Sequence, residues 1–205
     1  GEVDATTIHL GAGLYRPGVR IDAGNVTLDG QGVARIGWVG GIENAIDVWG
    51  DGATVRNLEI FGPATSAYTS FAWGSTNSRG IFVNRFADGA TVTNNAIHDI
   101  RTGIIVDGRN LGAVVTGNLI DNTKSGISVQ YTDGSNIILA GNSEGMFGNE
   151  WGINVHLNGI LQPDGTTIDP STSLVGGVPV GLLGTASLAE QQRLRPDRIR
   201  WLASL

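Results

Sequence analysis

The apolar residues of this chain recur in short segments in which every second position is apolar. Four of the segments share the pattern Gly-Ile-x-Val-x, and a looser copy precedes them. They are Asn44–Trp49, Arg79–Asn84, Thr102–Asp107, Ser125–Gln130 and Trp151–His156. In each pattern an isoleucine and a valine point to one side and the residue between them points to the other. That period of two predicts β-strands.

The segments repeat at a nearly constant step. After Gly80, the glycines of the pattern follow at intervals of 23, 23 and 26 residues. A second apolar segment begins at Ala53, Ala90 and Ala113, and its next copy at Asn136 is shifted by one residue. Such a unit cannot bury its apolar side alone, so neighbouring units must stack at the strand spacing of about 4.8 Å. Parallel crossovers are right-handed in nearly all cases. We therefore predict an all-β fold, a right-handed parallel β-helix solenoid of about five or six coils.

Stacked units place like residues on like residues. The expected inner stacks are Ile81, Ile104, Ile127 and Ile153, and beside them Val83, Val106, Val129 and Val155. The 32 glycines and many asparagines supply turns, because both tolerate the left-handed conformation. Asn95, Asn118 and Asn142 recur at steps of 23 and 24. We expect these asparagines to hydrogen-bond from coil to coil and to satisfy buried backbone groups.

The repeats fade toward the C-terminus, where the pattern changes. Ser187 and Glu190 read as a capping box, and Pro196 suits the first turn of a second helix. We expect residues 1–185 to form the parallel β-helix and residues 186–205 to form a short C-terminal helical cap of the same domain. A cap would cover the apolar end layer and the open strand edges. The alternative is that these helices bind a partner.

The repeats resemble those of the pectate-lyase-like superfamily of parallel β-helix proteins. The resemblance covers residues 7 to about 160, and Ile8–Tyr15 and Asn25–Gly32 look like the opening coil of many members. It implies a fold but no single activity, because the superfamily includes lyases, hydrolases, epimerases, phage tailspikes and noncatalytic surface modules. The sequence contains no paired-aspartate motif of the polygalacturonase type and no Arg-x-Pro-x-x-Arg motif of the pectate-lyase type. The Asp-Pro-His-Glu motif of alginate epimerases is missing too.

Composition narrows the classes of partner. The net charge is −6, which argues against nonspecific nucleic-acid binding because that needs a basic surface. No apolar run reaches the roughly 18 residues that cross a bilayer, so we expect no membrane span. Histidines and carboxylates do not cluster with the spacing of a metal site, and we expect no metal and no cofactor. Together with the resemblance, these features favour an extracellular or cell-surface protein.

One strip of the repeat is a candidate carbohydrate-binding face. Its main column is Trp49, Asn84, Asp107, Gln130 and His156, and the column beside it is Asp47, Phe82, Ile105, Ser128 and Asn154. Aromatic rings can stack on the apolar face of a sugar while planar polar groups bind its hydroxyls. Tyr131 lies one residue beyond the column, and Trp73 lies in a long insertion of the kind that often lines a binding face. The alternatives are an ordinary solvent face and an insertion that packs back onto the coils.

A second column is a candidate for catalysis. Two residues before each repeated glycine stand Glu43, Ser78, Arg101, Lys124 and Glu150, and we expect them to point outward. Arg101 and Lys124 lie one coil apart, about 5 Å between Cα atoms, so they could hold the carboxylate of a uronate sugar. His98, in the turn before Arg101, is a candidate acid or base. The alternatives are a surface charge ladder and a polar turn.

These observations favour a noncatalytic secreted or surface β-helix module with a carbohydrate-facing side, whose partner is a polysaccharide. The first alternative is a polysaccharide lyase or epimerase that acts on an acidic, uronate-containing glycan with His98, Arg101 and Lys124. The second alternative is a structural module that self-associates through the ends of its solenoid.

Overall fold

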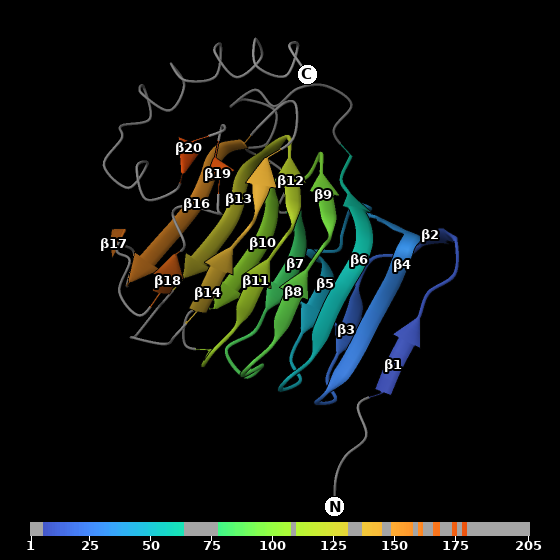
Figure 1. The fold of residues 1–205 in the computed structure, drawn as a ribbon. Coiled ribbons are helices and arrows are strands. Elements are labelled where there is room, and N and C mark those ends of the chain that lie inside the picture. Colours follow the sequence, from blue (N-terminus) through green and yellow to red (C-terminus); the bar gives the residue numbers. More distant parts are fainter. Residues whose placement is uncertain are drawn as a thin grey trace, which may run out of the picture.

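The computed structural model describes residues 6–63, 78–107, 110–130, 137–144, 149–157, 160–161, 166–168, 174–175 and 178–179, with side chains up to Ser143. Over these ranges the protein is all-β and forms a parallel β-solenoid of about five turns, which confirms the predicted fold class. The colours in Figure 1 run in order from blue at one end to orange at the other, because each coil lies beside the previous one. The predicted cap at residues 186–205 and its boundary with residues 1–185 lie outside the described residues.

Each turn of the solenoid adds one strand to each of three ladders. Two of these ladders are the arms of sheet A, which has eleven strands, and the third is sheet B, which has seven. The first arm consists of β1 (Thr6–His9), the first halves of β4 (Val26–Gly37) and β6 (Thr54–Phe61), β8 (Thr91–Thr93), β11 (Val114–Thr116), β14 (Ile137–Ala140) and β18 (Thr166–Ile168). The second arm consists of β2 (Gly13–Tyr15), the second halves of β4 and β6, β9 (Ala96–His98), β12 (Leu119–Asp121) and β15 (Ser143–Glu144).

Sheet B is the remaining side of the solenoid. It consists of β3 (Val19–Ile21), β5 (Asn44–Val48), β7 (Arg79–Val83), β10 (Thr102–Asp107), β13 (Thr123–Gln130), β16 (Asn149–Leu157) and β17 (Ile160–Leu161). All its pairs are parallel except the last, in which β17 runs antiparallel to β16. A separate antiparallel pair joins β19 (Leu174–Val175) to β20 (Val178–Pro179).

The predicted inner stacks are confirmed by the strand register. Ile81 lies opposite Ile104, which lies opposite Ile127, and Ile127 is paired in turn with Ile153. The side chains of Ile81, Ile104 and Ile127 are at most 2% exposed. The valine column is in register beside them. Burying these apolar stacks is the main source of stability in a repeat whose units have no core of their own.

The repeated glycine of sheet B is required by close packing between coils. A Cβ atom on Gly80 would lie 2.5 Å from the carbonyl oxygen of Gly103, and a Cβ on Gly103 would lie 2.6 Å from that of Gly126. These distances are shorter than any van der Waals contact. The Gly-Ile-x-Val pattern therefore combines a close backbone approach with an inward-facing strand.

Left-handed residues stack in the turns as well. Between the two arms of sheet A, after the first coil, the residues with positive φ are Asn57, Asn94, Gly117 and Gly141. In the turn from sheet B to the first arm they are Asn25, Gly52, Gly89 and Gly112. Because only glycine and asparagine adopt this conformation at low cost, the same two residue types recur at these corners, and this explains their abundance in the sequence.

A ladder of buried asparagines runs along the turn between the two arms, as predicted. Asn95, Asn118 and Asn142 are 2%, 0% and 3% exposed. The side-chain oxygen of Asn118 accepts from the backbone and side-chain N–H groups of Asn95, and the oxygen of Asn142 accepts from those of Asn118, all at 3.0–3.1 Å. Each side-chain NH2 also donates to a backbone carbonyl, that of Val55 or its equivalent in a later coil. The ladder thus satisfies backbone groups that would otherwise be buried without partners.

The shifted copy expected at Asn136 begins one residue later. Val114 pairs with Ile138 and Val115 with Leu139, so the step at this point is 24 residues. This register keeps Leu139 fully buried in the inner stack. A slip of one residue would turn every side chain of the strand to the other face, so burial fixes the register.

The long strand β4 contains a bulge that later coils lack. Asp29 pairs with Arg56 and Ala34 pairs with Leu58, so residues 30–33 lie opposite the single residue Asn57. Gln31 and Gly32 within this bulge have positive φ. Extra residues in one strand bend it locally and break the regular pairing. The bulge therefore interrupts the otherwise regular outer surface of sheet A.

Candidate functional site

The predicted carbohydrate-binding strip is in register on sheet B, but much of it is buried. The neighbouring column pairs Asp47 with Phe82, Phe82 with Ile105, and Ile105 with Ser128. Asp107 pairs with Gln130 in the main column. The exposed fraction falls to 8% or less at four positions: Asn84, Ile105, Asp107 and Ser128. Three other predicted ligands, Tyr131, Trp73 and the side chain of His156, lie outside the described residues.

The half-exposed end of the strip is rich in aromatic rings and arginines. We call the aromatic patch the group of Trp49, Phe82, Phe86, Arg20, Arg79 and Arg85. A guanidinium carbon lies over each ring, at 4.1 Å for Arg20 over Trp49, 5.9 Å for Arg79 over Phe82 and 4.6 Å for Arg85 over Phe86. The rings of Trp49 and Phe86 stack with centroids 5.9 Å apart. Since they come from neighbouring coils, the patch extends along the solenoid axis.

Several polar contacts hold the aromatic patch in place. Arg20 pairs with Asp22 at 2.6 Å, and Arg79 pairs with Glu43 at 2.7 Å. The side-chain oxygen of Asn84 accepts from the backbone N–H of Phe86 at 3.3 Å. The buried Asn84, predicted to be a sugar ligand, therefore shapes the turn that presents Phe86.

A polar group of the aromatic patch is buried, and a carboxyl group beside the patch is half-buried. The indole N–H of Trp49 is buried and has no hydrogen-bond partner among the described residues. The Asp47 carboxyl accepts from the side chain of Asn44 at 2.6 Å. Burial raises the pKa of Asp47 above its usual value, and the Asn44 hydrogen bond opposes that shift.

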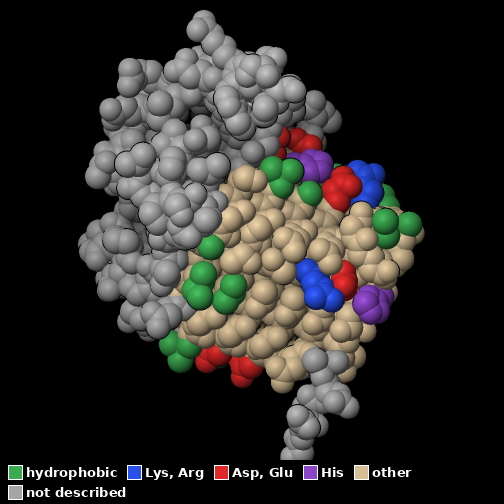
Figure 2. Space-filling view, viewed as in Figure 1, with side chains coloured by type: hydrophobic (Ala, Val, Ile, Leu, Met, Phe, Trp, Pro, Cys, Tyr) green, Lys and Arg blue, Asp and Glu red, His purple; other side chains and the backbone are tan. Residues whose placement is uncertain are grey.

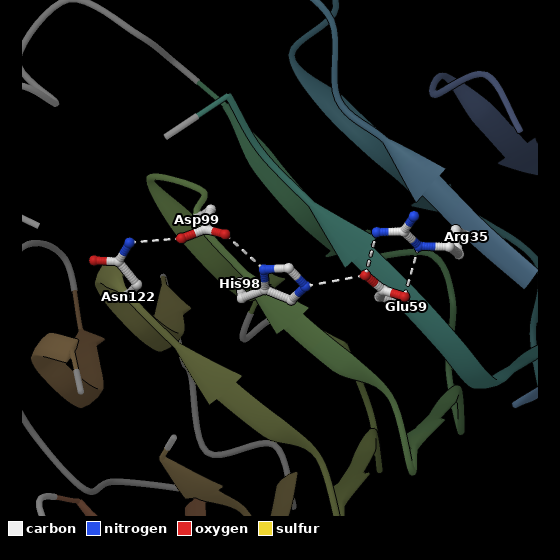
Figure 3. A network of polar contacts seen from close by, with 5 residues as sticks. All are labelled: Arg35, Glu59, His98, Asp99 and Asn122. Atoms are coloured by element: carbon white, nitrogen blue, oxygen red, sulfur yellow. Dashed lines mark hydrogen bonds and ion pairs between the residues drawn. The ribbon is translucent and has the colours of Figure 1, made fainter. Parts of the chain in front are cut away.

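His98 belongs to a chain of polar side chains on the outer face of sheet A (Figure 3). Arg35 donates two hydrogen bonds of 2.7 Å to Glu59, whose Oε1 lies 3.3 Å from the His98 Nε2. His98 Nδ1 lies 2.7 Å from Asp99, which accepts from Asn122 at 2.6 Å. Both ring nitrogens of His98 face carboxylates, and only the imidazolium form can donate to both at once.

The charged groups of this network are fixed by their partners. The hydrogen bonds from Arg35, followed by the contact with His98, hold the pKa of Glu59 below its usual value. The guanidinium of Arg35 also lies 4.8 Å from the ring of Phe61, which stacks on His98 at 6.0 Å. Sequence reasoning identified His98 but missed these partners. The sequence does contain one clue to these partners. Arg35 and Glu59 occupy paired positions on neighbouring strands, where opposite charges attract each other.

The predicted basic pair is stacked as expected, but its column is not an exposed ladder throughout. The backbone N–H of Lys124 donates to the carbonyl of Arg101 at 2.9 Å, so the two residues lie on adjacent coils. Ser78, which was expected to belong to an exposed column, is fully buried. Its hydroxyl accepts from the backbone N–H of Arg101 at 3.2 Å, which explains why a small polar residue occupies this place. The side chain of Glu150 lies outside the described residues.

A groove of about 590 Å³ crosses the outer face of sheet A where its two arms meet. Its lining residues are Asp29, Gln31, Gly32, Asn57, Leu58, Glu59, Asn94, Ala96 and His98. The bulge of β4 forms one side, and the strands of the second arm form the other. On the face seen in Figure 2, arginines lie next to acidic side chains. This is consistent with the ion pairs Arg56–Asp29 and Arg35–Glu59. Sequence reasoning did not find this groove, because it depends on the register shift.

No three or more His, Cys, Asp or Glu side chains in the described part of the chain are placed to hold a metal ion. Nor does any helix within this part have the length and apolar character that crossing a bilayer requires.

Comparison with known proteins gives no relative: no family model, no curated protein and no solved structure matches this chain.

Proposed function

We propose that this chain is a noncatalytic β-solenoid module of a secreted or surface protein, similar in fold to the pectate-lyase-like superfamily, and that it binds polysaccharide through the aromatic patch. The observation that carries the proposal is the stacked pair Trp49 and Phe86, with arginines over both rings. Phe86 is 55% exposed, so the part of its ring that Trp49 and Arg85 leave uncovered can contact the apolar face of a sugar.

The arginines of the patch supply the polar half of such an interaction. Arg20 and Arg79 are each held by one carboxylate, and a guanidinium has five N–H donors, so donors are left for sugar hydroxyls. Ring stacking and these two ion pairs position Trp49, Phe86 and the guanidinium groups of Arg20 and Arg79 before a ligand arrives. This lowers the entropy cost of binding.

A test is the affinity of the protein for a panel of immobilised and soluble polysaccharides, with two matched variants. Phe86→Ala should weaken binding about fivefold, since one aromatic contact contributes about 1 kcal/mol. Leu119→Ala removes a side chain of similar exposure, 45%, from the outer face of sheet A and should leave the affinity unchanged. Absence of binding to every polysaccharide, or equal affinity of Phe86→Ala and the wild type, would contradict the proposal.

The second candidate is a lyase or epimerase for an acidic glycan, and the stacking of Arg101 and Lys124 on adjacent coils favours it. The same polysaccharide panel separates this candidate from a binding module. Ultraviolet absorbance of an unsaturated uronate, lost in His98→Ala, would establish lyase activity in place of the noncatalytic function. Conversion of one uronate epimer to the other would establish an epimerase.

The third candidate is a structural module that self-associates through its ends. Within the described residues β1 pairs only with β4, and Ile8 of the inner stack is 47% exposed at that end. Light scattering tests this candidate directly. A mass that rises with protein concentration and falls when Ile8 is changed to Lys would support it.

A further inference from the structure

The groove on sheet A lies at a different place from the aromatic patch, and its chemistry is different. Its floor is the turn between the two arms, with Leu58 buried at its base. The bulge of β4 raises one rim, and there is open space around Gly32, where an added Cβ would meet no atom within 4 Å. The groove is therefore a feature of the first coils, where residues 30–33 lie opposite one residue of the next strand.

The carboxylates of the groove are already neutralised by arginines. Arg56 lies 2.9 Å from Asp29, and Arg35 binds both oxygens of Glu59. Hydrogen bonds from the Asn57 side chain and the Gln31 backbone, with Arg56, hold the pKa of Asp29 below its usual value. Both carboxylates are thus ionised and paired near neutral pH. A ligand gains little from carrying a net charge of either sign, because it would have to compete with these fixed partners.

The uncharged lining groups keep hydrogen-bonding capacity. The side chain of Asn94 is exposed and has no partner among the described residues. Asn57 uses its NH2 group to bind Asp29, which leaves its amide oxygen available. Both asparagines occupy left-handed turns, with φ of 57° and 55°, and lie about 4.8 Å apart on neighbouring coils. Their backbones therefore have the same left-handed conformation before any ligand binds.

We propose that this groove is a binding site for an uncharged polyhydroxylated ligand, such as a neutral sugar residue. The amides of Asn57 and Asn94 bind its hydroxyl groups, and the backbone over Leu58 and Ala96 supports its ring. The exposed Gln31 side chain on the bulge contributes a further amide at the rim. A planar amide both donates and accepts, so it suits a hydroxyl, which does the same. This site is independent of the proposed function at the aromatic patch.

The turn columns provide an unusually well matched pair of variants. Asn94→Gly removes the amide and keeps the left-handed backbone, since Gly117 and Gly141 occupy the same corner in later coils. Asn25→Gly makes the same change at an exposed left-handed asparagine, φ 56°, in the turn from sheet B, outside the groove. In both cases a glycine follows in the next coil, so the structural effect of the two substitutions is comparable.

The experiment is a titration of the isotopically labelled protein with glucose, galactose, mannose and maltose, followed by backbone amide chemical shifts. Glucosamine and galacturonate serve as the charged counterparts. We expect at least one neutral sugar to shift the amides of Leu58 and Ala96, with affinity at least tenfold weaker in Asn94→Gly. Asn25→Gly and Phe86→Ala should bind it like the wild type.

Three results would overturn the proposal. One is the absence of shifts at the groove amides with every neutral sugar, and another is equal affinity of Asn94→Gly and the wild type. The third is binding of a charged sugar at least tenfold tighter than its neutral counterpart, which would contradict the assigned class. None of these results decides whether the aromatic patch binds polysaccharide, because that proposal is tested separately with Phe86→Ala.

Discussion

Two groups of polar side chains run from coil to coil in this solenoid, and they are built in opposite ways. The asparagine ladder consists of identical amides that are at most 3% exposed. The surface network consists of different groups, Arg35, Glu59 and His98, whose side chains are 49%, 33% and 33% exposed. Both cross the strands of the same solenoid, about one strand spacing per step.

The difference follows from what each group can accept as a neighbour. An amide has donors and acceptors, so a stack of identical amides satisfies itself, as Asn95, Asn118 and Asn142 do. A charged group repels a copy of itself, so opposite charges such as Arg35 and Glu59 stabilise each other on neighbouring coils. Identical amides thus suit the buried ladder, and complementary charges suit the surface network.

The largest effect is expected when the ladder is broken in its middle. Asn118→Ala leaves the backbone N–H of Asn95 buried without a partner and removes three further hydrogen bonds of the ladder. A buried unsatisfied group costs about 1–3 kcal/mol and the lost side-chain hydrogen bonds add to this cost, so the free energy of unfolding should fall by about 3 kcal/mol. Chemical denaturation followed by circular dichroism measures this loss.

The control for this prediction is the amide next to the ladder. Asn94→Gly removes an exposed side chain with no partner among the described residues, and it should change stability by less than 1 kcal/mol, about the scale of a surface substitution. If Asn118→Ala were no more destabilising than Asn94→Gly, the buried ladder would not be the stabilising element that its hydrogen bonds indicate.

The same contrast explains how much the sequence could predict. The inner stacks at Ile81 and Ile104 and the ladder at Asn118 were predicted because identical residues recur at one step. The network was missed because the stacked positions of Arg35 and Glu59 are continued by Ala96, so nothing repeats. Only a register assigned strand by strand brings those residues together.

The groove and the aromatic patch were hidden for a related reason. The groove depends on residues 30–33 of β4, which look like part of a regular coil until their pairing with Asn57 is known. Phe86 and Arg85 of the patch lie in a turn outside the repeat, and their contacts with Trp49 and with each other depend on how that turn folds. Burial of Asp107 and Asn84 was equally invisible, since alternation predicts which face a side chain occupies but not what covers that face.

A smaller effect is expected when the sign alternation of the surface network is broken. Glu59→Lys places a cation next to Arg35, so an attractive contact becomes repulsive, and it removes the carboxylate beside His98. Because these groups are partly exposed, we expect a loss of about 1 kcal/mol, to be measured by chemical denaturation at low salt. Glu59→Gln, which keeps the shape without the charge, should lose less than Glu59→Lys. A ranking in the other order would show that the charges do not matter.

The smallest effect is a dependence of stability on pH, which the surface network can show and the asparagine ladder cannot. The pKa of Glu59 is held below its usual value of 4.5, so its ionised form stabilises the folded state. That contribution is complete above the unfolded-state pKa and is lost as the pH falls through the lower folded-state pKa. The stability difference between the wild type and Glu59→Gln should therefore stay constant from about pH 5.5 to 5 and shrink toward about pH 3.

Asn118→Ala provides the comparison for this measurement, because amides do not titrate. Its deficit relative to the wild type should be the same at each pH, since the other titrating groups, including Asp29, are common to both proteins and cancel in the difference. Denaturation curves of the three proteins between about pH 3 and 5.5 give both differences in one experiment. A Glu59→Gln deficit that persists undiminished at the acid end would mean that the carboxylate acts through packing rather than charge. In that case the surface network, like the buried ladder, would stabilise the fold by interactions that do not depend on charge.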